Sequence, residues 1–114
     1  MEFGVHLPLL ATAGPSMPVQ QVLSYVDHAN DLGFRYLAAH DHIAHPRPWI
    51  DGPTMLPAAM ARLGAMVPMT AVWLPVVRGP LAIARGLTAL DLLSEGRLIA
   101  GLGAGSSEAD FETA

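Results

Sequence analysis

Apolar runs alternate with helix-like stretches along this chain, and this alternation constrains the fold more than any other feature. The four apolar runs begin roughly 30 residues apart, as in βαβ units, and they are residues 3–7, 34–39, 69–74 and 97–102. Between them, apolar residues recur every three or four positions, as on one face of a helix. The order is therefore β-α-β-α-β-α-β, which implies parallel strands joined by right-handed crossovers.

Proline, glycine and hydroxyl residues indicate where the helices begin and end. Pro18 fits the first turn of one helix, with Ser16 as a nearby cap, and Gly33 fits its C-terminal end. Thr54 is the expected cap of a helix over residues 54–65, in which Pro57 is tolerated because it falls in the first turn. Pro75 is expected to end the third strand and residues 76–79 to form a loop, after which Pro80 opens a helix that extends to about residue 93. Residues 106–110 are expected to begin a further helix.

Two architectures are compatible with this order of elements. One is an open doubly wound sheet, and the other is a TIM (β/α)8 barrel. A complete barrel usually takes about 250 residues. The 114 residues form at most one domain, and in the barrel case they supply its N-terminal half, about four βα units.

Composition narrows the functional classes. Hydrophobic residues make up 52% of the chain and charged residues 14%, which favours strands buried on both faces. The net charge of −4 argues against nucleic acid as the main partner. The absence of cysteine excludes disulfides and thiolate metal sites. No apolar run reaches the length of a membrane span and the first residues lack a basic region, so we expect a cytoplasmic protein without a secretory signal.

In either architecture the ligand lies at the carboxyl ends of the strands. The second strand leads directly to His40, Asp41 and His42. A carboxylate beside an imidazole can hold one tautomer of the ring and make it a better proton acceptor. The alternative is structural, with Asp41 capping the following turn and His42 packing at the rim of the barrel.

A metal centre is a rival interpretation of the same loop. His40, His42 and His45 are spaced so that two imidazoles can meet one ion, with Asp41 as a third ligand. No other ligand cluster is evident in the sequence, and we expect no metal.

A glycine-spaced segment, GLGAG, follows the fourth strand at residues 101–105. It is not the G-x-G-x-x-G dinucleotide fingerprint. Either the strand exit needs positive φ angles, or bare amides approach a phosphate or a flat ring. Two arginines are candidate anion ligands. Of these, Arg78 follows the third strand, whereas Arg97 lies at the amino end of a strand and is expected to pair with Glu95 or Asp91.

Three segments carry a resemblance to a known family: FRYLAAHDH (residues 34–42), LPVVRGP (74–80) and LDLLSEGRLIAGLGAG (90–105). They resemble the amino-terminal part of luciferase-like monooxygenases, in particular the branch that uses the deazaflavin coenzyme F-420. The resemblance spans the whole chain, and its third segment is the most specific to the family.

The resemblance implies a (β/α)8 barrel with a flavin or deazaflavin across the carboxyl ends of its strands. It implies that His42 acts in proton or hydride chemistry and that Asp41 orients it. It places a bulge with a non-prolyl cis peptide at Ala71–Val72, supporting the ring of the cofactor. The glycine loop, Gly103, Ala104, Gly105 and Ser106, would line the cofactor. Coenzyme F-420 with hydride transfer is the first expectation, and FMN with molecular oxygen is the alternative.

Departures from the family pattern limit the activity. Ser106 stands where the sugar-phosphate dehydrogenases of the family carry an acidic glutamate, which argues against sugar-phosphate oxidation. Pro46 stands where they carry a tryptophan, for which Trp49 is the candidate replacement. The cofactor-phosphate site of the family comes from later strands.

Three further expectations concern the whole protein. The partner is a small-molecule substrate, and we expect a homo-oligomer. The non-enzymatic alternative is an inactive or self-assembling half-barrel, because four strands leave an open sheet edge. Sequencing the gene beyond Ala114 distinguishes a fragment from a natural half-barrel.

Overall fold

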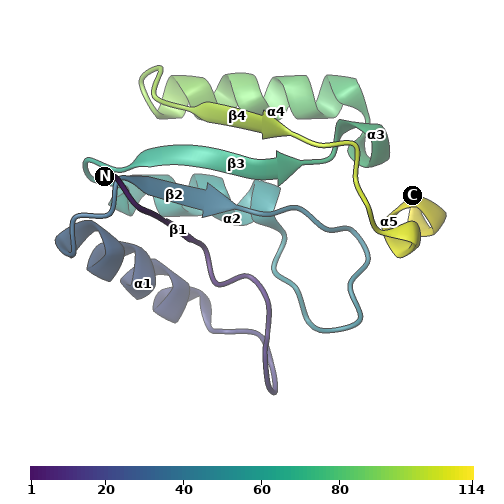
Figure 1. Cartoon of the computed structure of the whole chain (residues 1–114), viewed down its shortest axis with the longest axis horizontal. Coiled ribbons are helices and arrows are strands. Elements are labelled where there is room, and N and C mark those ends of the chain that lie inside the picture. Colours follow the sequence, from purple (N-terminus) through teal and green to yellow (C-terminus); the bar gives the residue numbers. More distant parts are fainter.

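A computed structural model describes all 114 residues, and it contains one parallel sheet of four strands in the order β1-β2-β3-β4. The strands are β1 (Gly4–His6), β2 (Tyr36–Ala39), β3 (Val67–Trp73) and β4 (Ile99–Leu102). Each strand pairs with the next one along the chain. All four carboxyl ends therefore point the same way, toward the right in Figure 1.

The helices decide between the two architectures. They are α1 (Val19–Asp31), α2 (Gly52–Ala59), α3 (Pro75–Arg78), α4 (Pro80–Leu93) and α5 (Glu108–Thr113), with a 3-10 turn, η1 (Met60–Arg62), after α2. One buried cluster joins α1, α2 and α4 to the same face of the sheet, through Leu37 and Ala39 among others. Figure 1 shows these three helices on one face. A doubly wound sheet needs helices on both faces, so the fold is the N-terminal part of a barrel.

The opposite face of the sheet is more exposed to solvent than the face covered by α1, α2 and α4. Ala38, Met69 and Ile99 share a register position on this face, and Ile99 is 42% exposed. In a closed barrel this face is the interior, where side chains from all the strands pack in layers. None of the helices is both long and apolar enough to cross a membrane.

Two helix boundaries differ from the sequence-based expectation. The N-cap of α2 is Asp51, whose carboxylate accepts the backbone N–H of Thr54 at 2.9 Å, so the predicted cap at Thr54 is wrong by three residues. Pro57 consequently lies beyond the first turn of α2, and the helix is short. No side chain caps α1, so the predicted cap at Ser16 is wrong as well. The predicted end of α1 is confirmed, since Gly33 follows the C-cap with φ of +78°.

Residues 76–79, which we expected to form a loop, belong for the most part to the short helix α3. Pro75 opens α3 and Pro80 opens α4, so two proline-initiated helices follow one another across Gly79. Periodicity does not reveal α3, because four residues are too few to show a helical pattern. The helix nevertheless matters for the site, because it carries Arg78.

Arg97 has the structural role that its position at the amino end of the sheet predicts, but its partners are different. Its guanidinium donates to the carbonyl oxygens of Ser94 and Met66 at 2.9 Å and of Gly64 at 3.2 Å. It forms no ion pair with Glu95 or Asp91, so the predicted pairing is wrong. Backbone carbonyls at the ends of neighbouring elements need donors, and Arg97 satisfies three of them.

Candidate active site

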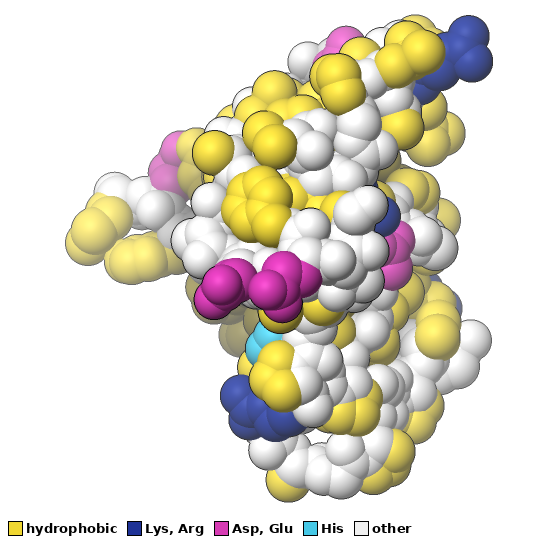
Figure 2. Space-filling model, turned by 90° about the vertical axis from the view of Figure 1, so that its right-hand side faces the viewer, with side chains coloured by type: hydrophobic (Ala, Val, Ile, Leu, Met, Phe, Trp, Pro, Cys, Tyr) yellow, Lys and Arg dark blue, Asp and Glu magenta, His cyan; other side chains and the backbone are white.

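A cavity of about 330 Å3 lies at the carboxyl ends of β2, β3 and β4. Its walls come from the exits of these strands and from α5, and the lining residues are His40, Asp41, His42, Ala71, Val72, Leu74, Gly105, Ser106 and Asp110. Figure 2 looks onto this end of the molecule and shows acidic side chains grouped near the middle of the face, with a histidine beside them.

The cavity brings together six of the eight site residues that the sequence predicted: Asp41, His42, Ala71, Val72, Gly105 and Ser106. Gly103 and Ala104 do not line it. A side chain at position 103 would meet the side chain of Val72 at 2.5 Å, so this glycine lets β4 pass close to β3. Gly105 has φ of +91°, a left-handed conformation that favours glycine. The backbone conformation of the glycine loop therefore accounts for much of its pattern.

The floor of the cavity is a bulge in β3. Thr70 pairs with Ala100 and Trp73 pairs with Leu102, so β3 has one residue more than β4 over this stretch. The bond between Ala71 and Val72 is a non-prolyl cis peptide, and both the predicted bulge and the predicted cis bond are confirmed. The buried Thr70 hydroxyl bridges the gap, since it donates to the Gly101 carbonyl at 2.7 Å and accepts the Gly101 N–H at 2.8 Å.

Asp41 does not orient His42, which corrects the sequence-based expectation. Its carboxylate is fully buried and accepts hydrogen bonds from Arg78 Nε at 2.8–2.9 Å, from Arg78 Nη2 at 2.6 Å and from the Leu74 N–H at 3.2 Å. Asp41 therefore binds Arg78 and Leu74 and makes no hydrogen bond to His42, although the two are adjacent in sequence.

Arg78 joins two carboxylates. Besides Asp41 it binds Asp51, the N-cap of α2, through Nη2. The Asp41 carboxylate, followed by that of Asp51, outweighs burial and raises the pKa of Arg78. Because its guanidinium is committed to two carboxylates within the protein, Arg78 is not the free anion ligand that the sequence suggested.

The carboxylate that does contact His42 is Asp110, in the first turn of α5. Asp110 Oδ2 lies 2.9 Å from His42 Nδ1, and Oδ1 accepts the backbone N–H groups of Ile43 at 2.8 Å and Ala44 at 2.6 Å. Asp110 is 1% exposed. Burial opposes its ionisation, but the hydrogen bonds with the Ala44 N–H, with His42 and with the Ile43 N–H outweigh burial and lower the pKa of Asp110.

Sequence reasoning missed Asp110 because it lies 68 residues beyond His42. The only local signal is an acid in the first turn of a short helix, which is ordinary at helix N-termini. Its burial and its partner depend on the packing of α5 against the β2 exit.

The remaining imidazoles of this end form a cluster with Trp49. The ring of His6 stacks on that of His40 at 3.9 Å, and the ring of Trp49 meets that of His42 edge-on at 4.8 Å. Burial lowers the pKa of His6, and burial followed by the charges of the neighbouring imidazoles lowers that of His40. Trp49 thus packs against His42, although Pro46 occupies the position of the tryptophan in the related dehydrogenases.

The side chains considered as metal ligands make other contacts. His42 Nδ1 binds Asp110, the ring of His40 stacks on His6, and His45 Nδ1 accepts the N–H of Arg47 at 3.2 Å. No three histidine or acidic side chains are arranged to hold an ion.

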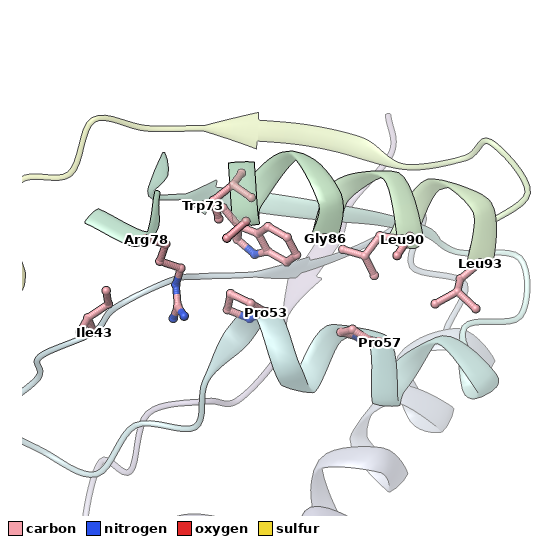
Figure 3. A pocket seen from close by; sticks show the side chains of 11 residues that line it. Ile43, Pro53, Pro57, Trp73, Arg78, Gly86, Leu90 and Leu93 are labelled. Atoms are coloured by element: carbon pink, nitrogen blue, oxygen red, sulfur yellow. The ribbon is translucent and has the colours of Figure 1, made fainter. Parts of the chain in front are cut away.

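A larger cavity of about 550 Å3 lies between α2 and α4, on the helix-covered face of the sheet. Figure 3 shows Pro53 and Pro57 on one side of it, Trp73, Gly86 and Leu90 on the other, and Arg78 at one end. Its only ionisable group is Arg78, which is already paired. Size alone therefore does not identify the catalytic site, and the smaller cavity, which contains His42, is the better candidate.

Comparison with known proteins shows which family has this fold and sequence. The family model for luciferase-like monooxygenases matches residues 1–114. The chain belongs to this family. The monooxygenase RslO1 from Streptomyces bottropensis is a similar solved structure, with 30% identity and a TM-score of 0.80 over 99% of this chain and 36% of that one.

Two further similar structures are an F-420-dependent enzyme and an FMN complex. The coenzyme F-420-dependent tetrahydromethanopterin reductase from Methanopyrus kandleri is 26% identical, with a TM-score of 0.75 over 98% of this chain and 29% of that one. The oxygenating constituent of 3,6-diketocamphane monooxygenase from Pseudomonas putida, in complex with FMN, is 19% identical, with a TM-score of 0.78 over 98% and 32%. The chain thus spans about a third of the length of these similar structures, one of which is F-420-dependent and another of which binds FMN.

The cavity suits one end of such a cofactor. Ala71, Val72 and Leu74 offer an apolar surface for a flat ring, and His42 and Ser106 offer polar edges. No lysine or arginine lines the cavity, so these residues do not provide a site for the phosphate end.

Proposed function

We propose that the protein containing this chain is an oxidoreductase that transfers a hydride between a small-molecule substrate and coenzyme F-420 at the carboxyl ends of the strands. The observation that carries the proposal is the single cavity shared by His42, the bulge at Ala71–Val72 and the glycine loop at Gly105–Ser106. Membership of the luciferase-like family supports the reaction class.

The bound cofactor supplies the hydride or electron transfer at its ring. The bulge of β3 and the backbone at Gly105 position that ring, and Leu74 helps to exclude water from it. His42 exchanges a proton with the substrate, since it is a partly exposed imidazole in the cavity whose other ring contacts, Asp110 and Trp49, hold it in place.

FMN-dependent monooxygenation is the second candidate, supported by the 30% identity to a monooxygenase over 99% of the chain. The proposed roles of the bulge and of His42 are the same for both cofactors. Titrating the full-length protein with reduced and oxidised F-420 and FMN, followed by ring absorbance and fluorescence, distinguishes the candidates. Binding of neither ring would contradict the proposal for both cofactors.

The decisive test is His42→Ala in the full-length protein. We expect turnover to fall by about 10²–10⁴-fold, the usual contribution of a general acid or base, with cofactor affinity nearly unchanged. His28→Ala is the control, because this exposed imidazole on α1 does not line the cavity and is expected to have little effect. Unchanged turnover in His42→Ala would exclude His42 from the chemistry.

A homo-oligomer and a cytoplasmic location stay predictions. Both concern the whole protein, and the chain spans about a third of the length of the similar structures.

A further inference from the structure

We propose that Asp110 is a positioning residue that holds His42 as the Nδ1–H tautomer and leaves Nε2 as the ring nitrogen that exchanges the proton. The inference deepens the proposed function and rests on it for its catalytic meaning. Its structural content, the tautomer of His42, is testable without any cofactor or substrate.

The hydrogen-bonding capacities at Asp110 support this assignment. A backbone N–H can only donate, so Oδ1 must accept from both Ile43 and Ala44. An ionised carboxylate is an acceptor at both oxygens, so the contact of 2.9 Å with Oδ2 requires a hydrogen on His42 Nδ1. In a neutral imidazole the other nitrogen then carries a lone pair.

The ionised state of Asp110 follows from its surroundings. Two backbone N–H groups, of Ile43 and Ala44, donate to this buried carboxylate, and with the contact to His42 they lower its pKa although burial opposes ionisation. No basic side chain other than His42 contacts it. The same carboxylate therefore attaches residues 42–44 to α5 and determines which nitrogen of His42 is free.

Asp110→Asn separates these two effects. The amide oxygen of Asn can still accept from Ile43 and Ala44, while the amide NH2 takes the place of Oδ2 and donates toward His42. Nδ1 must then act as the acceptor, so neutral His42 should change to the Nε2–H tautomer while the loop stays anchored.

The measurement is the ¹⁵N chemical shift of each ring nitrogen in histidine-labelled protein, recorded on the 114-residue chain at about pH 8.5, where imidazoles are ordinarily neutral. His42→Gln assigns the signals of His42. His28 is an internal reference, because its Nδ1 lies 2.8 Å from the Ser24 carbonyl, which can only accept. Glu108→Gln is the matched control, since it removes the same charge from the same helix at an exposed position.

We expect Nδ1–H on His42 in the wild type and in Glu108→Gln, and Nε2–H in Asp110→Asn. The inference is overturned by Nε2–H in the wild type, a measurement that needs no variant to fold, or by an unchanged tautomer in a folded Asp110→Asn. In the full-length protein we expect Asp110→Asn to lower turnover by about 10²–10⁴-fold with substrate affinity nearly unchanged. An effect of His42→Ala without a tautomer change in Asp110→Asn would refute the positioning role and leave the proposed function standing.

Discussion

Two buried carboxylates flank the exit of β2, and they are used in opposite ways. Asp41 is satisfied by the permanently charged guanidinium of Arg78 and by the Leu74 N–H. Asp110 is satisfied by two backbone N–H groups and by an imidazole that can gain or lose a proton. The first arrangement ties β2 to α3 and α2, whereas the second leaves a titratable ring at the wall of the cavity. The partner of a buried carboxylate therefore decides its role. Asp41 stabilises the fold, whereas Asp110 belongs to the candidate active site.

The largest effect is expected from removing the partner of Asp41. Arg78→Met leaves a fully buried carboxylate without its cation, which usually costs about 3–5 kcal/mol of stability. Urea unfolding measures this loss. Arg85→Met is the control, because Arg85 is exposed on α4 without hydrogen bonds or ion pairs, and surface changes of this kind stay within about 0.5 kcal/mol. Equal stability of the two variants would contradict the supporting role of Asp41 and Arg78.

A smaller effect is expected at Asp110. Asp110→Ala removes the acceptor of two backbone N–H groups, which costs about 1–3 kcal/mol. Asp110→Asn keeps that acceptor and should retain most of the stability, while the tautomer of His42 changes. If the two variants unfold at the same urea concentration, the carboxylate does not anchor residues 43 and 44.

The smallest effect is a loss of stability between pH 7 and pH 5, and it should come from His6 and His40. Both have a pKa lowered from the ordinary value of 6.5, so the folded protein favours the neutral rings. Below that value the unfolded chain binds more protons, and stability falls as the pH falls. The pKa values of Asp51 and Asp110 are lowered from 3.8, so these acids add to the loss only in stronger acid.

The pH effect is measured as the urea midpoint at each pH. His40→Asn should flatten the dependence between pH 7 and pH 5, whereas His28→Asn, at an exposed position of α1, should leave it as in the wild type. A steep dependence that persists in His40→Asn would assign the loss of stability to other groups.

Periodicity in the sequence predicted the main elements because each depends on local patterns. The apolar runs correspond to the four strands, and the helical spacing corresponds to α1, α2 and α4. The boundaries that were wrong, such as the start of α2, depend on which side chain captures a free N–H, and Asp51 does so before Thr54. The four residues of α3 lie below the length at which periodicity is informative.

The sequence predicted which strand ends form the candidate site, but not which side chains hydrogen-bond to one another there. Residues 40–42, 71–72 and 105–106 meet because parallel strands bring their carboxyl ends to one edge of the sheet. The interpretation of Asp41 and His42 as a pair was wrong because each side chain binds a partner that is far away in sequence, Arg78 for Asp41 and Asp110 for His42.

The sequence by itself determined the order of strands and helices and the edge of the sheet at which the cavity lies, since these follow from local periodicity and from the handedness of the crossovers. Only the tertiary structure decided that the helices cover one face, that Asp41 belongs to Arg78 and that His42 belongs to Asp110. Hydrogen bonds between residues far apart in the chain depend on distances that packing sets, and local sequence carries no record of those distances.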